Sequence, residues 1–127
     1  VHYKEGEFYK AHHDAFPPNS SRHQGPAGAH QHGNRVATVL LYLNDVEEGG
    51  GTSFPECRKT IVPEVGKAVI FSNTYIGTQV KDPQSLHSAD PVIKGEKYAV
   101  NLWFRNREDT NLNYQNWLKE REKELEK

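Results

Sequence analysis

The segment "RVATVLLYLN" (residues 35–44) contains the longest apolar run of the chain, residues 36–43. Its turn-forming neighbours are "HGN" before it and "EEGGG" shortly after it. A short apolar run between turn signals, rich in Val, Leu and Thr, is typical of a β-strand, and it is far too short to cross a bilayer. The segment therefore predicts a strand in a β-rich protein.

Short apolar or alternating runs recur on both sides of this segment, separated by turns rich in glycine, proline and asparagine. They predict seven more strands, at residues 1–3, 8–14, 52–55, 59–63, 67–73, 85–90 and 96–106. Eight short strands favour an all-β core of the jelly-roll or double-stranded β-helix type, with a meander or up-and-down barrel as the alternative. Residues 113–126 instead have the composition and spacing of a C-terminal α-helix.

The composition limits the classes of function. With 127 residues we expect one domain over residues 1–127. The 16 Lys and Arg against 17 Asp and Glu give a net charge of -1, which argues against nucleic acid or a membrane surface as partner. Cys57 is the only cysteine, so an intrachain disulfide is excluded and the compartment stays unknown, as does the oligomeric state. Because the chain begins with Val1 and holds no methionine, we expect a processed chain or a piece missing upstream residues.

Residues 15–34, "AFPPNSSRHQGPAGAHQHGN", show no hydrophobic period. A loop of this length in a compact domain is often a functional lid, and we interpret it as a candidate lid. Its three histidines, His23, His30 and His32, are expected to be solvated loop residues, with adventitious metal binding or substrate contact as the alternative.

The doublet in "FYKAHHDAF" (residues 8–16) raises the question of which histidine acts with Asp14. Side chains two residues apart in a strand share a face, so His12 and Asp14 point the same way and His13 points to the other side. His12 and Asp14 could together bind a divalent metal. An ordinary polar strand edge is the alternative for the pair alone.

A third ligand is needed, and His87 in the separate strand "SLHSAD" is the best candidate. Two imidazoles and one carboxylate leave three positions open on an octahedral metal, an arrangement diagnostic of non-haem Fe(II) oxygenases. A structural zinc site would close its four positions and would favour cysteines, which this chain does not supply. The pattern therefore predicts a metal that also binds a co-substrate.

Lys97, ten residues after His87, is predicted to share one face of its strand with Ala99, Asn101 and Trp103. An inward lysine needs an anion, such as the carboxylate of a small acidic co-substrate, to which Tyr3 could add a hydroxyl group. A solvated lysine at a strand end is the alternative.

Taken in order, "VHYKEGEFYKAHHDAF", "RVATVLLYLNDVEEGGGTSFPE", "IVPEVGKAVIF" and "SLHSADPVIKGEKYAVNLWF" resemble the successive blocks of the prolyl 4-hydroxylase-like Fe(II)- and 2-oxoglutarate-dependent dioxygenases, from Val1 to about Arg105. The resemblance implies a double-stranded β-helix. It also implies that His12, Asp14 and His87 bind Fe(II), that Lys97 pairs with the distal carboxylate of 2-oxoglutarate, and that Tyr3 hydrogen-bonds the same carboxylate. Retention of Asp14 argues for hydroxylation, because related halogenating enzymes leave that position open for halide.

The resemblance further implies a prolyl residue of a peptide or protein as substrate, O2 as co-substrate, succinate and CO2 as products, and ascorbate as an accessory reductant. Arg35 and Trp103 are weak candidates for substrate contact. The alternative for Arg35 is a surface salt bridge, and the alternative for Trp103 is a position in the core. Two alternatives remain open: an oxygenase of this type acting on another side chain or a small molecule, and a non-catalytic cupin-like metal-binding module.

Overall fold

The computed structural model describes residues 1–17, 33–106 and 114–125. Most of the predicted lid, with His23, His30 and His32, lies outside the described residues. The chain forms two four-stranded antiparallel sheets and a separate strand pair. The first sheet has the order β1 (His2–Tyr3), β10 (Lys97–Arg105), β3 (Arg35–Tyr42) and β7 (Ala68–Ser72). The second has the order β2 (Tyr9–His12), β8 (His87–Ala89), β5 (Thr52–Phe54) and β6 (Lys59–Ile61).

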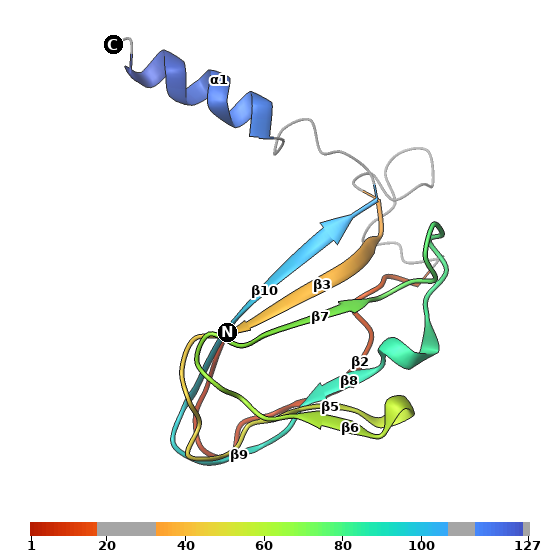
Figure 1. The fold of residues 1–127 in the computed structure, drawn as a ribbon, viewed down its shortest axis with the longest axis vertical. Helices are drawn as coiled ribbons and strands as arrows, with labels where there is room; N and C mark the ends of the chain where they lie inside the picture. The colour runs from red at the N-terminus through yellow and green to blue at the C-terminus, as the bar shows by residue number, and fades with distance from the viewer. Residues whose placement is uncertain (18–32, 107–113, 126–127) are drawn as a thin grey trace.

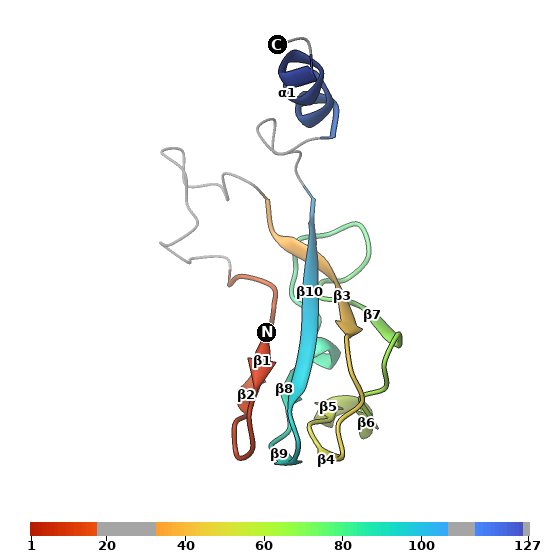
Figure 2. The ribbon, with the colours of Figure 1, turned by 90° about the vertical axis from the view of Figure 1, so that its left-hand side faces the viewer.

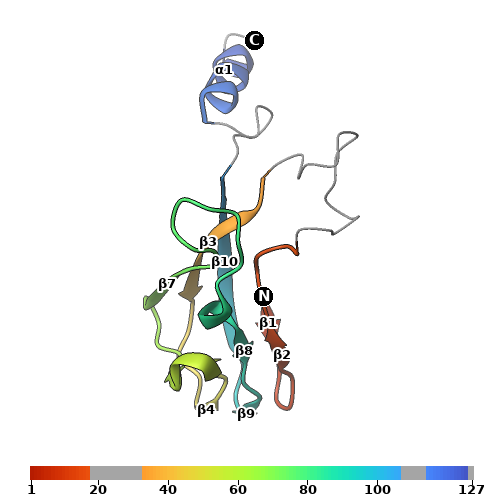
Figure 3. The same cartoon turned by 90° about the vertical axis from the view of Figure 1, so that its right-hand side faces the viewer.

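The two sheets form the two walls of an open double-stranded β-helix, as Figure 1 shows. Consecutive strands β1 and β2 belong to different sheets, so the turn between them joins the walls along one edge (Figure 2). Turned to its other side, the molecule shows β8 of the second wall with the 3-10 helix Pro83–Ser85 leading into it (Figure 3). The predicted jelly-roll class is confirmed, and the meander alternative is wrong because strands distant in sequence are hydrogen-bonded neighbours.

All eight predicted strands are present, and the structure adds two short ones, β4 (Glu48–Gly49) and β9 (Val92–Lys94), which pair with each other. These strands are too short to form a sequence pattern, and Gly49 permits their pairing. It adopts φ +77°, and a Cβ there would clash with the backbone oxygen of Pro91. From the sequence alone, "EEGGG" could be a simple flexible turn. In the structure, its Gly49 also permits two backbones to approach each other closely.

The space between the sheets is unusually polar. The longest strands pair in a register that places Leu40 opposite Asn101 and Tyr42 opposite Ala99, and Leu40, Tyr42 and Ala99 form the small apolar core. Among the described residues, nine polar or charged side chains are buried against six apolar ones. Burying polar groups costs free energy unless they are paired, so this interior is built as a binding site as well as a packed core.

The predicted C-terminal helix is present as α1 (Tyr114–Leu125). Within the described ranges, neither this helix nor any other has the length and apolar character needed to cross a bilayer.

Candidate metal centre

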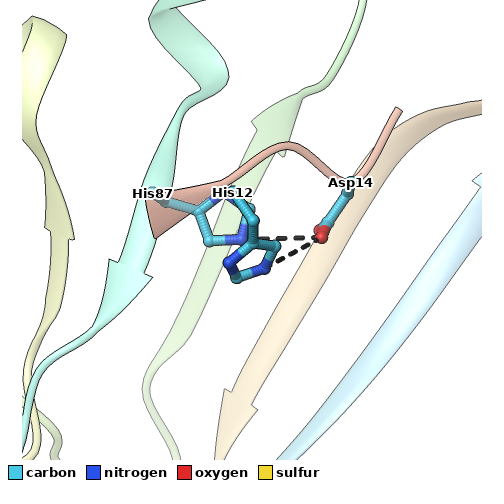
Figure 4. Close-up of side chains that lie close together, drawn as sticks. All are labelled: His12, Asp14 and His87. Carbon is cyan, nitrogen blue, oxygen red and sulfur yellow. Dashed lines mark ion pairs between the residues drawn. The ribbon is translucent and has the colours of Figure 1, made fainter. Parts of the chain in front are cut away.

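His12, Asp14 and His87 lie together because of strand pairing. His12 ends β2, His87 begins β8, and the two are direct register partners, with ring centroids 4.4 Å apart. Asp14 follows two residues after His12 and turns its carboxylate toward both rings (Figure 4). Its Oδ1 lies 3.5 Å from Nε2 of His12 and 3.6 Å from Nε2 of His87. One possible ligand atom from each of the three residues lies within 4.8 Å of the other two.

Hydrogen bonds select which ring nitrogen faces this cluster. Nδ1 of His12 lies 2.8 Å from the carbonyl oxygen of Lys10, and Nδ1 of His87 lies 2.8 Å from that of Ser85. A carbonyl oxygen only accepts, so each Nδ1 carries the hydrogen and each neutral imidazole presents the lone pair of Nε2. Two lone pairs and a carboxylate oxygen that converge without a proton between them fit a cation, and this donor set suits Fe(II).

The protonation states of the cluster differ from ordinary values. Burial alone would raise the pKa of Asp14, but the adjacent His12 ring, the hydrogen bond from Thr38 and the nearby His87 lower it to about 2. Burial lowers the pKa of His87, whose ring packs against Phe54 and Phe71. Burial is the largest influence on the pKa of His12 and acts to lower it, but the carboxylate of Asp14 and the carbonyl oxygen of Lys10, which favour the protonated ring, together outweigh burial and raise the pKa. The site therefore keeps Asp14 ionised as a metal ligand requires.

His13 lies outside this cluster. Its Nδ1 lies 3.2 Å from Oγ of Ser85, and its side chain lines the same cavity without being one of the three clustered ligands. His12 and Asp14 lie together as predicted, but β2 ends at His12 and His13 lines the same cavity, so strict strand alternation does not describe residues 13 and 14.

Lys97 begins β10 and is only 2% exposed. Its Nζ lies over the rings of Tyr3 and Tyr42, 5.5 and 5.6 Å from their centroids. Among the residues that the structure describes, no carboxylate lies within the 4 Å of an ion pair with this ammonium. Burial lowers the pKa of Lys97 to about 8, and the charge of Asp90 opposes this change. A buried ammonium without an anion fits an acidic ligand better than the solvated lysine that the sequence left open.

All seven residues singled out by the sequence line one cavity of about 330 Å³, within the usual range for small-ligand pockets. They come from both sheets: Tyr3, His12, Asp14, Arg35, His87, Lys97 and Trp103.

Arg35 and Trp103 stand together in this wall. The Arg35 guanidinium lies 3.8 Å from the Trp103 ring and 4.6 Å from the Phe16 ring. A register shift between Phe104 and Arg105 places Arg35 opposite Arg105 and skips Val36. This bulge reverses the strand alternation, so Arg35 reaches the cavity wall together with Thr38. Trp103 remains 43% exposed, so a core position does not describe it. Among the described residues Arg35 forms no ion pair, so its predicted surface salt bridge is not seen there.

Sequence reasoning missed Thr38 and Asn73. Thr38 is 2% exposed and donates a 2.7 Å hydrogen bond from Oγ1 to Oδ2 of Asp14. Asn73 is fully buried and donates from Nδ2 to Oγ1 of Thr38 at 2.8 Å. The signal for Thr38 was present, since it is a polar residue in phase with Leu40 and Tyr42; Asn73 follows β7 in an ordinary turn and carries no such signal.

A double-stranded β-helix with two histidines and one carboxylate at one end of a cavity and a buried lysine in the same wall defines the class of non-haem iron oxygenases. The family model described as the 2OG-Fe(II) oxygenase superfamily matches residues 1–105, and the chain belongs to this superfamily.

Similar proteins share one description. Prolyl 4-hydroxylase 1 and prolyl 4-hydroxylase 5 of Arabidopsis thaliana are 34% and 33% identical to this chain, covering 84% and 82% of it but only 40% of their own length. The crystal structure of a viral collagen prolyl hydroxylase from Paramecium bursaria Chlorella virus-1, in complex with 2-oxoglutarate, superposes with a TM-score of 0.70 at 31% identity. The superposed region covers 84% of this chain and 56% of the viral enzyme's chain. The family predicted from the sequence blocks is confirmed, and the chain spans less than two thirds of these relatives.

Proposed function

We propose that this chain carries the catalytic core of a prolyl 4-hydroxylase that uses Fe(II), 2-oxoglutarate and O2 to hydroxylate a prolyl residue in a peptide or protein. The observation that carries the proposal is the pairing, in one cavity, of the His12, Asp14 and His87 cluster with the buried ammonium of Lys97. The names of the relatives support proline as the target.

In this proposal His12 and His87 hold Fe(II) through Nε2 and Asp14 holds it through Oδ1. The bound metal and 2-oxoglutarate, together with O2, supply the oxidation of an unactivated C–H bond, with succinate and CO2 as products. The backbone carbonyls of Lys10 and Ser85 keep both imidazoles in the tautomer that binds metal.

Lys97 binds the distal carboxylate of 2-oxoglutarate, and the Tyr3 hydroxyl is the candidate for a second hydrogen bond to it. Lys97 is buried in the cavity wall, so an ion pair formed here is less screened by solvent than one at the surface. Ascorbate is proposed as the accessory reductant that keeps iron in the Fe(II) state, as in the family that the sequence resembles.

Arg35 and Trp103 are proposed to meet the peptide. The guanidinium and the indole stack at the cavity wall, and a flat stacked pair offers both an apolar surface and hydrogen-bond donors to an extended backbone. One domain over residues 1–127, with residues 15–34 as a lid, is part of the same proposal.

The test is succinate release by the metal-loaded protein with 2-oxoglutarate, with and without a proline-rich peptide, followed by mass spectrometry of the peptide. A gain of one oxygen on proline supports the proposal. Succinate release stimulated by another side chain or small molecule, but never by proline, would replace the substrate assignment. Metal binding without 2-oxoglutarate turnover would favour the non-catalytic module.

A further inference from the structure

The two oxygens of the Asp14 carboxylate have different surroundings. Oδ1 faces the Nε2 atoms of His12 and His87. Oδ2 faces away from them and accepts two hydrogen bonds, from Thr38 Oγ1 at 2.7 Å and from Trp103 Nε1 at 3.2 Å. One oxygen is thus free for a metal, while the other is occupied by protein donors.

Strand register explains why both donors reach the same atom. Thr38 on β3 and Trp103 on β10 are direct cross-strand partners, and both side chains point toward the cavity. The sheet therefore presents a hydroxyl and an indole N–H side by side to Asp14, which arrives from the opposite wall. The Arg35 guanidinium stacks on the indole at 3.8 Å and restrains its orientation.

Asn73 determines the direction of the Thr38 hydroxyl. Thr38 Oγ1 donates its only proton to Oδ2 of Asp14 at 2.7 Å. Oγ1 must then accept its other bond, which the Asn73 amide donates at 2.8 Å. The Asn73 Oδ1 atom is left buried without a hydrogen-bond partner among the described residues, which costs free energy. In the opposite amide orientation Oδ1 would accept the Thr38 proton, and Oδ2 of Asp14 would lose that hydrogen bond instead.

We propose that Thr38 and Trp103 are positioning residues: they occupy Oδ2 of Asp14 with hydrogen bonds and leave Oδ1 as its single metal-binding oxygen. Asn73 orients the Thr38 hydroxyl. This inference rests on the proposed iron site. A carboxylate bound through both oxygens would occupy one more metal position. Single-oxygen binding keeps three positions open on an octahedral metal, which is what a chelating co-substrate and O2 together need.

The test uses Mn(II), which accepts the same ligands without oxidation, as the probe of the metal site. Thr38→Val removes the hydroxyl and keeps the shape, Thr38→Ser restores the hydroxyl, and Trp103→Phe removes the second donor independently. Thr60→Val is the matched control, because Thr60 bonds Ser53 at 2.8 Å on β6 and contacts none of the three ligands. Mn(II) affinity is measured by titration, and Asp14 coordination by crystal structures of the Mn(II)-loaded proteins.

We expect Thr38→Val and Trp103→Phe each to weaken Mn(II) binding by about 10-fold or more, the usual range for partners of metal ligands. Asp14 in these variants turns or binds through both oxygens. Thr38→Ser and Thr60→Val retain the original affinity.

An unchanged affinity and single-oxygen binding in both Thr38→Val and Trp103→Phe would overturn this inference and leave the proposed function intact, even where the variants unfold at lower temperature. Failure of the unaltered protein to bind Mn(II) or Fe(II) would overturn the proposed function as well.

Discussion

Replacing Lys97 by Met should make the ligand-free protein more stable and unable to bind 2-oxoglutarate. Burial lowers the pKa of Lys97 from 10.5 to about 8, and a change of this size corresponds to about 3 kcal/mol of destabilisation of the ammonium. Water in the cavity offsets part of this cost, so we expect a net gain of about 1–2 kcal/mol at pH 7. Methionine is an unbranched apolar side chain one atom shorter than lysine, so it fills most of the same space without the charge.

The gain should depend on pH. Below about pH 8 the folded and unfolded chains both carry the charged lysine, so the full burial cost is present. Between pH 8 and 10.5 the folded protein releases the proton while the unfolded chain retains it. The stability of the original protein therefore rises in this window, and the advantage of Lys97→Met shrinks.

Urea unfolding at pH 7 and pH 10 measures both effects. Lys94→Met is the control, because Lys94 is exposed and pairs with Glu47 at the surface, and we expect it to change stability by less than about 0.5 kcal/mol. Addition of 2-oxoglutarate should stabilise the metal-loaded original protein and leave Lys97→Met unaffected. Reduced stability of Lys97→Met at pH 7, or an equal gain at both pH values, would refute the account of a buried unpaired charge.

Three further outcomes follow from the site. His12→Ala should abolish Fe(II) binding, measured anaerobically, whereas His13→Ala should preserve it; equal losses would contradict the strand-face assignment. In the metal-free protein, the contribution of Asp14 to stability should be present above about pH 4 and be lost toward pH 2, because its folded pKa of about 2 lies below the ordinary 3.8; acid unfolding of Asp14→Asn checks this. Arg35→Lys should raise the peptide KM without changing the 2-oxoglutarate requirement, because lysine cannot stack flat on Trp103; a matching change in both would assign Arg35 to the co-substrate.

The features that could be predicted from the sequence depend on short-range geometry. The two-residue period of a strand predicted that His12 rather than His13 acts with Asp14 and that Lys97 is in phase with Ala99, and neither prediction needs knowledge of the partner strand. The eight strands were recognisable because turns rich in glycine and proline bound them. The order of the motifs along the chain also predicted the superfamily, which the family model confirms.

The features that escaped prediction depend on the register between distant strands. β4 and β9 are too short to form a pattern and exist only because Gly49 lets two backbones meet. The bulge beside Arg105 reverses the face on which Arg35 lies, against simple alternation.

The amino-acid order thus specified which residues share a strand face, and hence which side chains were available as ligands, because local backbone geometry sets that face. Which of those side chains meet was decided by the pairing of β2 with β8 and of β3 with β10. Only that pairing brings His87 to His12 and directs Thr38 and Trp103 to the second oxygen of Asp14. Contacts between residues far apart in the chain depend on sheet register, which the packing of the whole fold selects.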